Sequence, residues 1–105
     1  MQQRIEIVGI DGLEYCKIFQ CATMPSVGFE VDIAKEAKIT NLTSPSPNFF
    51  DSNIFTFQIS CSDINVTSIV LLNIISNWLY DKLKNKKISY SEYETKISIT
   101  VKNDD

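Results

Sequence analysis

Three cysteines are the most nucleophilic side chains of this chain of 105 residues, which contains no histidine. Without histidine, Ser-His-Asp and Cys-His catalysis in their usual forms are excluded, and so is the commonest metal ligand. Cys16 and Cys21 would lie about 17 Å apart on a strand and on diverging sides of a helix, so they should not form a disulfide. Zinc would need a fourth ligand and a different spacing. We therefore predict that Cys16, Cys21 and Cys61 are small buried hydrophobic residues and that the protein has no metal site and no cofactor.

The other groups that could do chemistry are carboxylates, lysines and tyrosines, and no motif marks any of them as catalytic. Glu92 and Glu94 would share one face of a strand, but no second set of residues supports them as an acid–base pair. The three glycines, at positions 9, 12 and 28, cannot form a phosphate-binding loop. We predict no catalytic residue and a protein that binds rather than catalyses. The alternative is a small enzyme or ligand-binding protein that uses tyrosine, lysine or carboxylate groups in a pocket.

Four lysines, at positions 82, 84, 86 and 87, cluster where a helix is expected to end. Lysines at this place complement the negative end of the helix dipole, and we prefer this interpretation. A nucleic-acid accessory protein that binds through the Lys82–Lys87 end is the alternative. The net charge of −3 and the lack of interleaved aromatic residues disfavour it, so we expect no nucleic-acid partner.

Several features of the sequence bear on where the protein resides. No apolar run approaches the roughly 18 residues of a membrane span, and the first residues lack the pattern of a signal peptide. An odd number of cysteines suits a reducing compartment. We therefore expect a cytoplasmic protein with no membrane partner. Frequent Ile, Asn, Ser and Lys, with Arg4 as the single arginine, are typical of an AT-rich microbial or phage genome.

The stretch VGIDGLEYCKIF, residues 8–19, permits two interpretations. Asp11 and Gly12 between β-rich runs predict a tight hairpin, which would pair Glu6 with Lys17 and other suitable cross-strand partners. Asp11 with Glu14 three positions later is also a capping box, which would begin a helix. We prefer the hairpin because exposed aromatic and β-branched residues form helices poorly.

Hydrophobic periodicity predicts the next elements. Alternation indicates strands over residues 27–33 and 54–61, and a further strand over residues 38–43 is possible. Between them, residues 44–53 form a loop rich in proline, serine and phenylalanine, with Phe49 and Phe50 side by side. One or both phenylalanines could fold back onto the core, or the loop could protrude for recognition.

The C-terminal part combines a helix and a strand. Residues 66–84 lack glycine and proline and spread their apolar residues over half of the helical circumference, which predicts a long amphipathic helix. Residues 88–101 change phase near Ser91 and Glu92, which predicts a β-bulge. Residues 103–105 should be a frayed tail.

Together these predictions describe one α+β domain over residues 1–105. Its mostly antiparallel sheet would have about five or six strands, with the helix of residues 66–84 on one face and the order β-β-β-(β)-β-α-β. The size, mild acidity and lack of catalytic motifs are typical of small inhibitor, immunity, adaptor or subunit proteins of microbes and phages. No motif carries a resemblance to a particular family.

A hairpin at the N-terminus would be apolar on both faces, and one helix covers only one of them. The second face would be covered by curling of the sheet, by the Phe49–Phe50 loop, or by another chain. We therefore predict a protein-binding module whose partner is another protein, a second copy of itself, or both. The predicted partner-binding residues are the following: Val8, Ile10, Tyr15, Phe19, Phe49 and Phe50.

Overall fold

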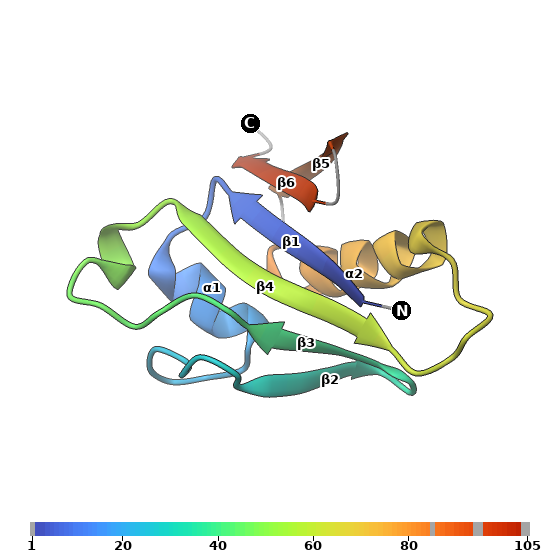
Figure 1. Cartoon of the computed structure of the whole chain (residues 1–105). Helices are drawn as coiled ribbons and strands as arrows, with labels where there is room; N and C mark the ends of the chain where they lie inside the picture. Colours follow the sequence, from blue (N-terminus) through green and yellow to red (C-terminus); the bar gives the residue numbers. More distant parts are fainter. Residues whose placement is uncertain (1, 85, 94–95, 104–105) are drawn as a thin grey trace.

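The computed structural model describes residues 2–84, 86–93 and 96–103, which form a six-stranded mixed sheet and two α-helices (Figure 1). The elements in chain order are β1 (Gln2–Val8), α1 (Gly12–Ile18), β2 (Glu30–Ala34), β3 (Ala37–Asn41), the 3₁₀ helix η1 (Phe49–Asp51), β4 (Ile54–Cys61), α2 (Ser68–Lys82), β5 (Lys86–Tyr93) and β6 (Lys96–Asn103). The strand order in the sheet is β2-β3-β4-β1-β6-β5. Within these ranges only β1 and β6 pair in parallel, so the predicted α+β class with a mostly antiparallel sheet is confirmed.

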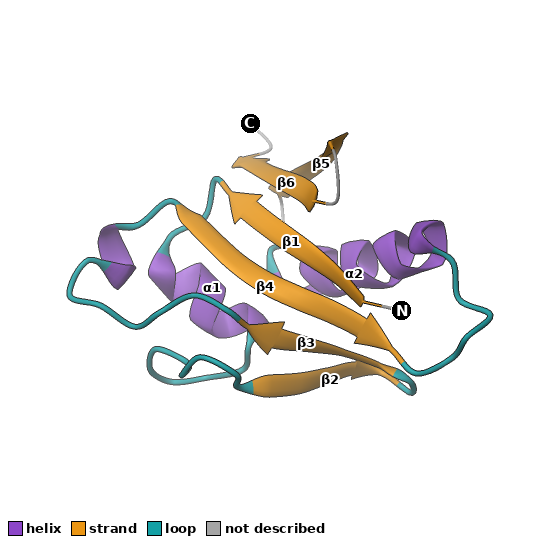
Figure 2. Cartoon of the chain, viewed as in Figure 1, coloured by secondary structure: helices purple, strands orange, loops and turns teal. Residues whose placement is uncertain are grey.

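The two faces of the sheet differ in polarity, as strand alternation requires. Alternate residues of the strands face the helices and are buried, and register places Ile5 between Phe57 and Ile97. The residues between them, such as Arg4, Glu6 and Gln58, lie on the opposite, open face. Figure 2 shows both helices on the same side of the sheet. The expectation of an apolar second face is therefore wrong: the face without helices is mostly polar.

Residues 12–18 are helical, and the hairpin expected over residues 3–21 is wrong. The capping box is complete: the Glu14 amide donates to Asp11 Oδ1 at 2.9 Å, and the Asp11 amide donates to Glu14 Oε1 at 3.2 Å. At the other end the Cys21 amide donates to the Cys16 carbonyl at 2.9 Å, while Gln20 has a φ of 55°. These local bonds close both ends of a short helix. Packing on the sheet outweighs the weak helix propensity of its aromatic residues.

The C-terminal part contains two strands, β5 and β6, and the predicted bulge is wrong. Their antiparallel register runs without a shift from Lys86–Asn103 to Tyr93–Lys96. The change of phase near Ser91 and Glu92 therefore marks two strands that share one apolar face. Asn103 belongs to β6, and the predicted frayed residues Asp104 and Asp105 lie outside the described residues. The element order is β-α-β-β-β-α-β-β, which replaces the predicted order.

α2 spans 15 residues, Ser68–Lys82, and is shorter than the predicted helix of residues 66–84. It begins where the Thr67 hydroxyl accepts a hydrogen bond from the Val70 amide at 3.3 Å. Leu71, Ile75 and Leu79 form its buried stripe, one turn apart. Cover of the sheet is thus shared between α1 and α2 rather than supplied by one helix.

Candidate functional site

The structure places most of the predicted partner-binding residues inside the core. Ile10, Tyr15, Phe19 and Phe49 are at most 3% exposed. Val8 lies half-buried at one end of the open face, beside Ile54 of β4, and Phe50 is 45% exposed. These residues were predicted because residues 12–18 were expected to form a strand with an uncovered apolar face. In the structure residues 12–18 form α1, which covers the apolar side of the sheet. A partner contact through any of them stays a prediction.

The loop of residues 44–53 covers one end of the core with one of its two phenylalanines. The Phe49 ring lies 5.4 Å from the Phe55 ring and 6.0 Å from the Tyr15 ring, measured between centroids. Phe50 stacks edge-on against Phe49 at 5.3 Å and keeps an exposed side. Phe49 therefore folds back onto the core, which is one of the two predicted alternatives. Phe50 remains partly exposed at the surface.

A groove runs between the edge strand β2 and helix α2. It consists of two adjoining hollows of about 290 and 340 Å³, which share Ala34 and Ile74. We call it the β2–α2 groove, and its apolar lining consists of Ile33, Ala34, Ala37, Cys61, Val66, Ile74 and Trp78. Lys35, Glu36, Asn77 and Asp81 line its rim. The sequence pattern predicted Ile33, Cys61, Ile74 and Trp78 on buried faces and gave no signal that a groove separates the two elements.

Local sequence explains why apolar side chains meet there. Val31 and Ile33 of β2 both pack against the core on the helix side of the sheet. The register shift between Asp32 and Ala34 allows the adjacent residues Ile33 and Ala34 both to line the groove. Ile74 and Trp78 are one turn apart on α2 and therefore lie on one side of that helix. The Trp78 indole N–H donates to the Ile18 carbonyl of α1 at 3.2 Å, and the Lys82 ammonium lies 4.5 Å from the ring centroid. These contacts hold the Trp78 wall of the groove in place.

A buried amide fixes the chain just before β2. Asn41, which is fully buried, donates through Nδ2 to the carbonyls of Pro25 and Ser26 at 3.0 Å each. Its Oδ1 accepts from the Tyr15 hydroxyl at 2.6 Å and from the Thr43 amide at 2.9 Å. Among the described residues no buried side-chain nitrogen or oxygen lacks a hydrogen-bond partner. This network, which the sequence pattern did not reveal, sets the position of the loop that leads to β2.

The buried position of Tyr15 keeps its phenol neutral. Burial raises the pKa of the Tyr15 phenol well above its usual value, since the charged form would lose its hydration. Tyr15 therefore acts as a hydrogen-bond donor inside the core, and it is not placed as a surface nucleophile or base.

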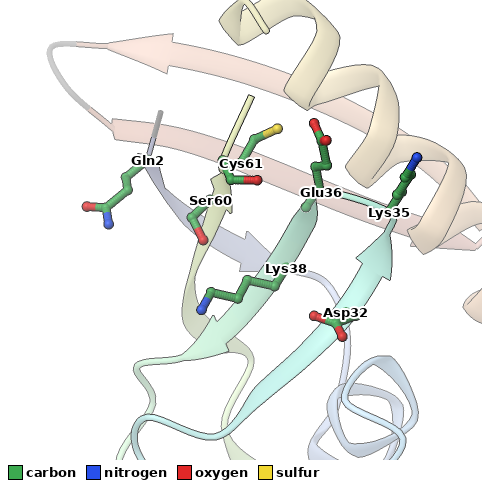
Figure 3. A pocket seen from close by; sticks show the side chains of 9 residues that line it. Gln2, Asp32, Lys35, Glu36, Lys38, Ser60 and Cys61 are labelled. Atoms are coloured by element: carbon green, nitrogen blue, oxygen red, sulfur yellow. The ribbon is translucent and has the colours of Figure 1, made fainter. Parts of the chain in front are cut away.

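A polar pocket of about 370 Å³ lies at the turn between β2 and β3 (Figure 3). Its lining includes Gln2, Asp32, Lys35, Glu36, Lys38 and Ser60. Lys38 forms an ion pair with Glu30 across the two strands at 2.9 Å. This pocket shares residues 35–37 and Cys61 with the β2–α2 groove, so a polar and an apolar hollow meet at the same turn.

The cysteines do not form a reactive cluster among the described residues. Cys16 and Cys61 are buried, as predicted, and Cys21 is partly buried. Burial raises the pKa of both the Cys16 and the Cys21 thiols, with a further contribution from Cys21 to that of Cys16, so both favour the neutral thiol. The turn after α1 brings the Cys21 backbone to Cys16, whereas spacing alone had placed the two far apart. The described residues contain no group of three or more His, Cys, Asp or Glu residues suited to a metal ion.

The lysine cluster is split between two elements. Lys82 lies over Trp78 on α2, and Lys86 on β5 pairs with Glu14 of α1 at 3.1 Å. Lys84 is exposed between them, and Lys87 is exposed on β5. Of the two carboxylates considered as a pair, Glu92 is exposed on β5 and Glu94 lies outside the described residues.

Over the part of the chain that the structure describes, no helix has the length and apolar character needed to cross a membrane. Comparison with known proteins gives no relative: no family model, no curated protein and no solved structure matches this chain.

Proposed function

We propose that this protein is a non-enzymatic protein-binding module that holds its partner in the β2–α2 groove. The observation that carries the proposal is an edge strand with an apolar groove directly beside it. Among the described residues β2 pairs with β3 alone, so its other edge has peptide groups available to another chain. A groove that offers both apolar side chains and backbone hydrogen bonds suits a polypeptide.

This proposal changes the surface expected from the sequence while keeping the expected class of function. The predicted residues Ile10, Tyr15, Phe19 and Phe49 support the core, and the groove residues Ile33, Ile74 and Trp78 take their place as the proposed contact.

The test compares two isoleucines of α2. Ile74 lines the groove, whereas Ile69 on the same helix is 69% exposed and lies outside it. Tagged wild-type, Ile74→Lys and Ile69→Lys proteins, each checked for native circular dichroism, would be used to capture proteins from a lysate of the source organism. We expect a protein that wild type and Ile69→Lys retain and Ile74→Lys loses, and that binds the purified chain again in a titration. Captured proteins that do not distinguish Ile74→Lys from Ile69→Lys would contradict the proposal.

A second candidate function is ligand binding or catalysis in the polar pocket. The observation in its favour is that Asp32, Lys35, Glu36 and Lys38 surround one hollow. A thermal-shift screen with small dicarboxylates, diamines and phosphates tests it. Stabilisation that is lost in Lys35→Met and kept in Lys84→Met would favour this function over the groove.

A further inference from the structure

The chemistry around β2 specifies the partner segment more closely than the groove alone does. On the basis of the proposed function, we infer that the groove accepts an extended segment of another protein, which adds to the edge of β2 and alternates basic with apolar side chains. Strand alternation supplies this pattern, since successive side chains of an added strand face opposite sides of the sheet.

On the helix side, the added strand meets apolar surface. Ile33, Ile74 and Trp78 line the hollow next to β2, and its volume of about 340 Å³ has room for aliphatic side chains. Side chains at alternate positions of the partner would enter this hollow. Burial of a single side chain does not offset the entropy lost on association, so two or three of them are needed for measurable affinity.

On the open side, the added strand meets carboxylates. Glu30 and Asp32 are exposed on that face of β2, and Glu36 at the β2–β3 turn lines the polar pocket beside them. Lys35 and Lys38 are the cations that line this side, and Lys38 is already paired with Glu30 at 2.9 Å. On the helix side, Asp81 is paired with Lys82 at 3.8 Å and adds no net charge. The excess of negative charge favours lysine or arginine at the alternate positions of the partner.

The length of regular pairing is limited. The β2–β3 register shifts between Asp32 and Ala34, which marks a bulge at the end of β2. Regular pairing with an added strand is therefore confined to residues 30–32, and contacts in the groove must supply the rest of the affinity.

A second copy of the chain fits this edge poorly. Suppose that two copies pair through residues 30–32 of β2, with both α2 helices on one side of the joined sheet. Glu30 or Asp32 of one copy would then lie opposite Glu30 or Asp32 of the other. Like charges directly opposite each other destabilise a strand pair. The other edge strand, β5, begins with Lys86 and Lys87, and lysines on an edge discourage pairing. A contact between β2 and β5 of different copies would be heterologous and would build a ring or a filament rather than a dimer.

The test uses four labelled peptides and fluorescence polarisation. The first is Lys-Val-Lys-Val-Lys-Val-Lys, and the second has the same composition with the lysines and valines in two blocks. The third replaces every lysine with glutamate, and the fourth is the first peptide with alternate amides N-methylated. We expect the first peptide to bind roughly tenfold or more tightly than each of the others, since only it combines positive charge, alternation and free amide donors.

Variants of the protein locate the site. Asp32→Lys and Ile74→Lys should each weaken binding of the first peptide by roughly tenfold. Ser89→Lys introduces the same charge on the open face of β5 and should leave the affinity unchanged. Equal binding to Asp32→Lys and Ser89→Lys would overturn the inference.

Two outcomes separate this inference from the proposed function. If a captured partner depends on Ile74 but N-methylation leaves peptide binding intact, strand addition is overturned and the groove remains the binding site. If neither capture of a partner nor binding of any peptide depends on Ile74, both the inference and the proposed function are contradicted. In sedimentation experiments, assemblies that grow with concentration and shrink in Lys87→Glu would show that β5 of a second copy occupies the groove, which would overturn the choice of a foreign segment.

Discussion

β2 and β5 are both edge strands of the same sheet, but the helices meet them in different ways. At β5, Lys86 reaches Glu14 of α1 and forms an ion pair whose side chains are only about 20% exposed. At β2, the neighbouring helix α2 leaves an apolar groove, and the charges on the strand are exposed carboxylates. The two edges also differ in how they are protected against pairing: β5 begins with lysines, whereas β2 is only five residues long and ends in a bulge.

The difference shows that the two edges are stabilised by different parts of the molecule. β5 depends on β6, which pairs in parallel with the central strand β1. β2 depends on β3 and on the Asn41 network that holds the preceding loop. Substitutions that weaken one support should therefore affect one edge more than the other.

The largest expected effect is that of Gly9→Ala, at the β6 side of the sheet. Gly9 has a φ of 93°, and a Cβ at this position would lie 1.9 Å from the Val101 carbonyl oxygen of β6. Backbone must move to accommodate it, so we expect a loss of more than about 3 kcal/mol in the free energy of unfolding. Urea denaturation measures the loss, and hydrogen exchange should show β5 and β6 opening before β2.

The matched control is Gly28→Ala, just before β2. Gly28 has a similar φ of 90°, but nothing lies within 4 Å of its Cβ position. Only the backbone conformation is strained, so we expect a loss of about 1–2 kcal/mol. Equal losses for the two substitutions would show that the contact with Val101 does not support the β5 side.

Asn41→Ala should have the next largest effect and act on the β2 side. It removes the donor to the Pro25 and Ser26 carbonyls and an acceptor of the Tyr15 hydroxyl. Buried groups left without partners should lower the free energy of unfolding by about 2–4 kcal/mol. The measurement is urea denaturation with hydrogen exchange at β2. Asn73→Ala, an exposed substitution on α2, is the control and should change stability little.

Tyr15→Phe tests the same network through pH. The folded pKa of Tyr15 is raised above its unfolded value near 10, so its contribution is fully present below about pH 10 and is lost as the pH rises above that value. The wild-type free energy of unfolding should therefore fall above about pH 10, and Tyr15→Phe should reduce this fall while costing about 1–2 kcal/mol at neutral pH. Tyr80→Phe, on the exposed side of α2, should keep the wild-type pH dependence. An unchanged alkaline fall in Tyr15→Phe would contradict the assignment.

The smallest expected effects concern the ion pairs of the two edges. Lys86→Met breaks the partly buried pair with Glu14 and should cost about 1 kcal/mol. Lys38→Met breaks a pair with Glu30 whose side chains are about half exposed, and it should cost less than about 0.5 kcal/mol. Thermal unfolding at low and high salt measures both. If Lys38→Met proves the more destabilising, the proposed difference between the edges is reversed.

Local pattern determined most of the elements but misassigned two of them. Strict alternation gave β4 almost to the residue, and helical periodicity gave α2 within about two residues at each end. Residues 8–19 were compatible with both strand pairing and helix capping, and the pattern favoured the wrong one. Only packing of Tyr15 and Phe19 against Phe55 and Phe57 distinguished the two. The phase change near Ser91 was likewise compatible with a bulge or with a second strand, because both produce the same pattern of apolar residues.

The sequence alone did not predict the β2–α2 groove. Ile33 and Trp78 are 45 positions apart, and their periodicities indicate only that each faces something apolar. The sequence by itself determined the polarity of each strand and helix face, because side-chain direction follows from local backbone geometry. Tertiary structure alone decided the rest. Strand order made β2 an edge, and the separation of α2 from β2 opened a groove beside it, since both depend on contacts between segments that are distant along the chain.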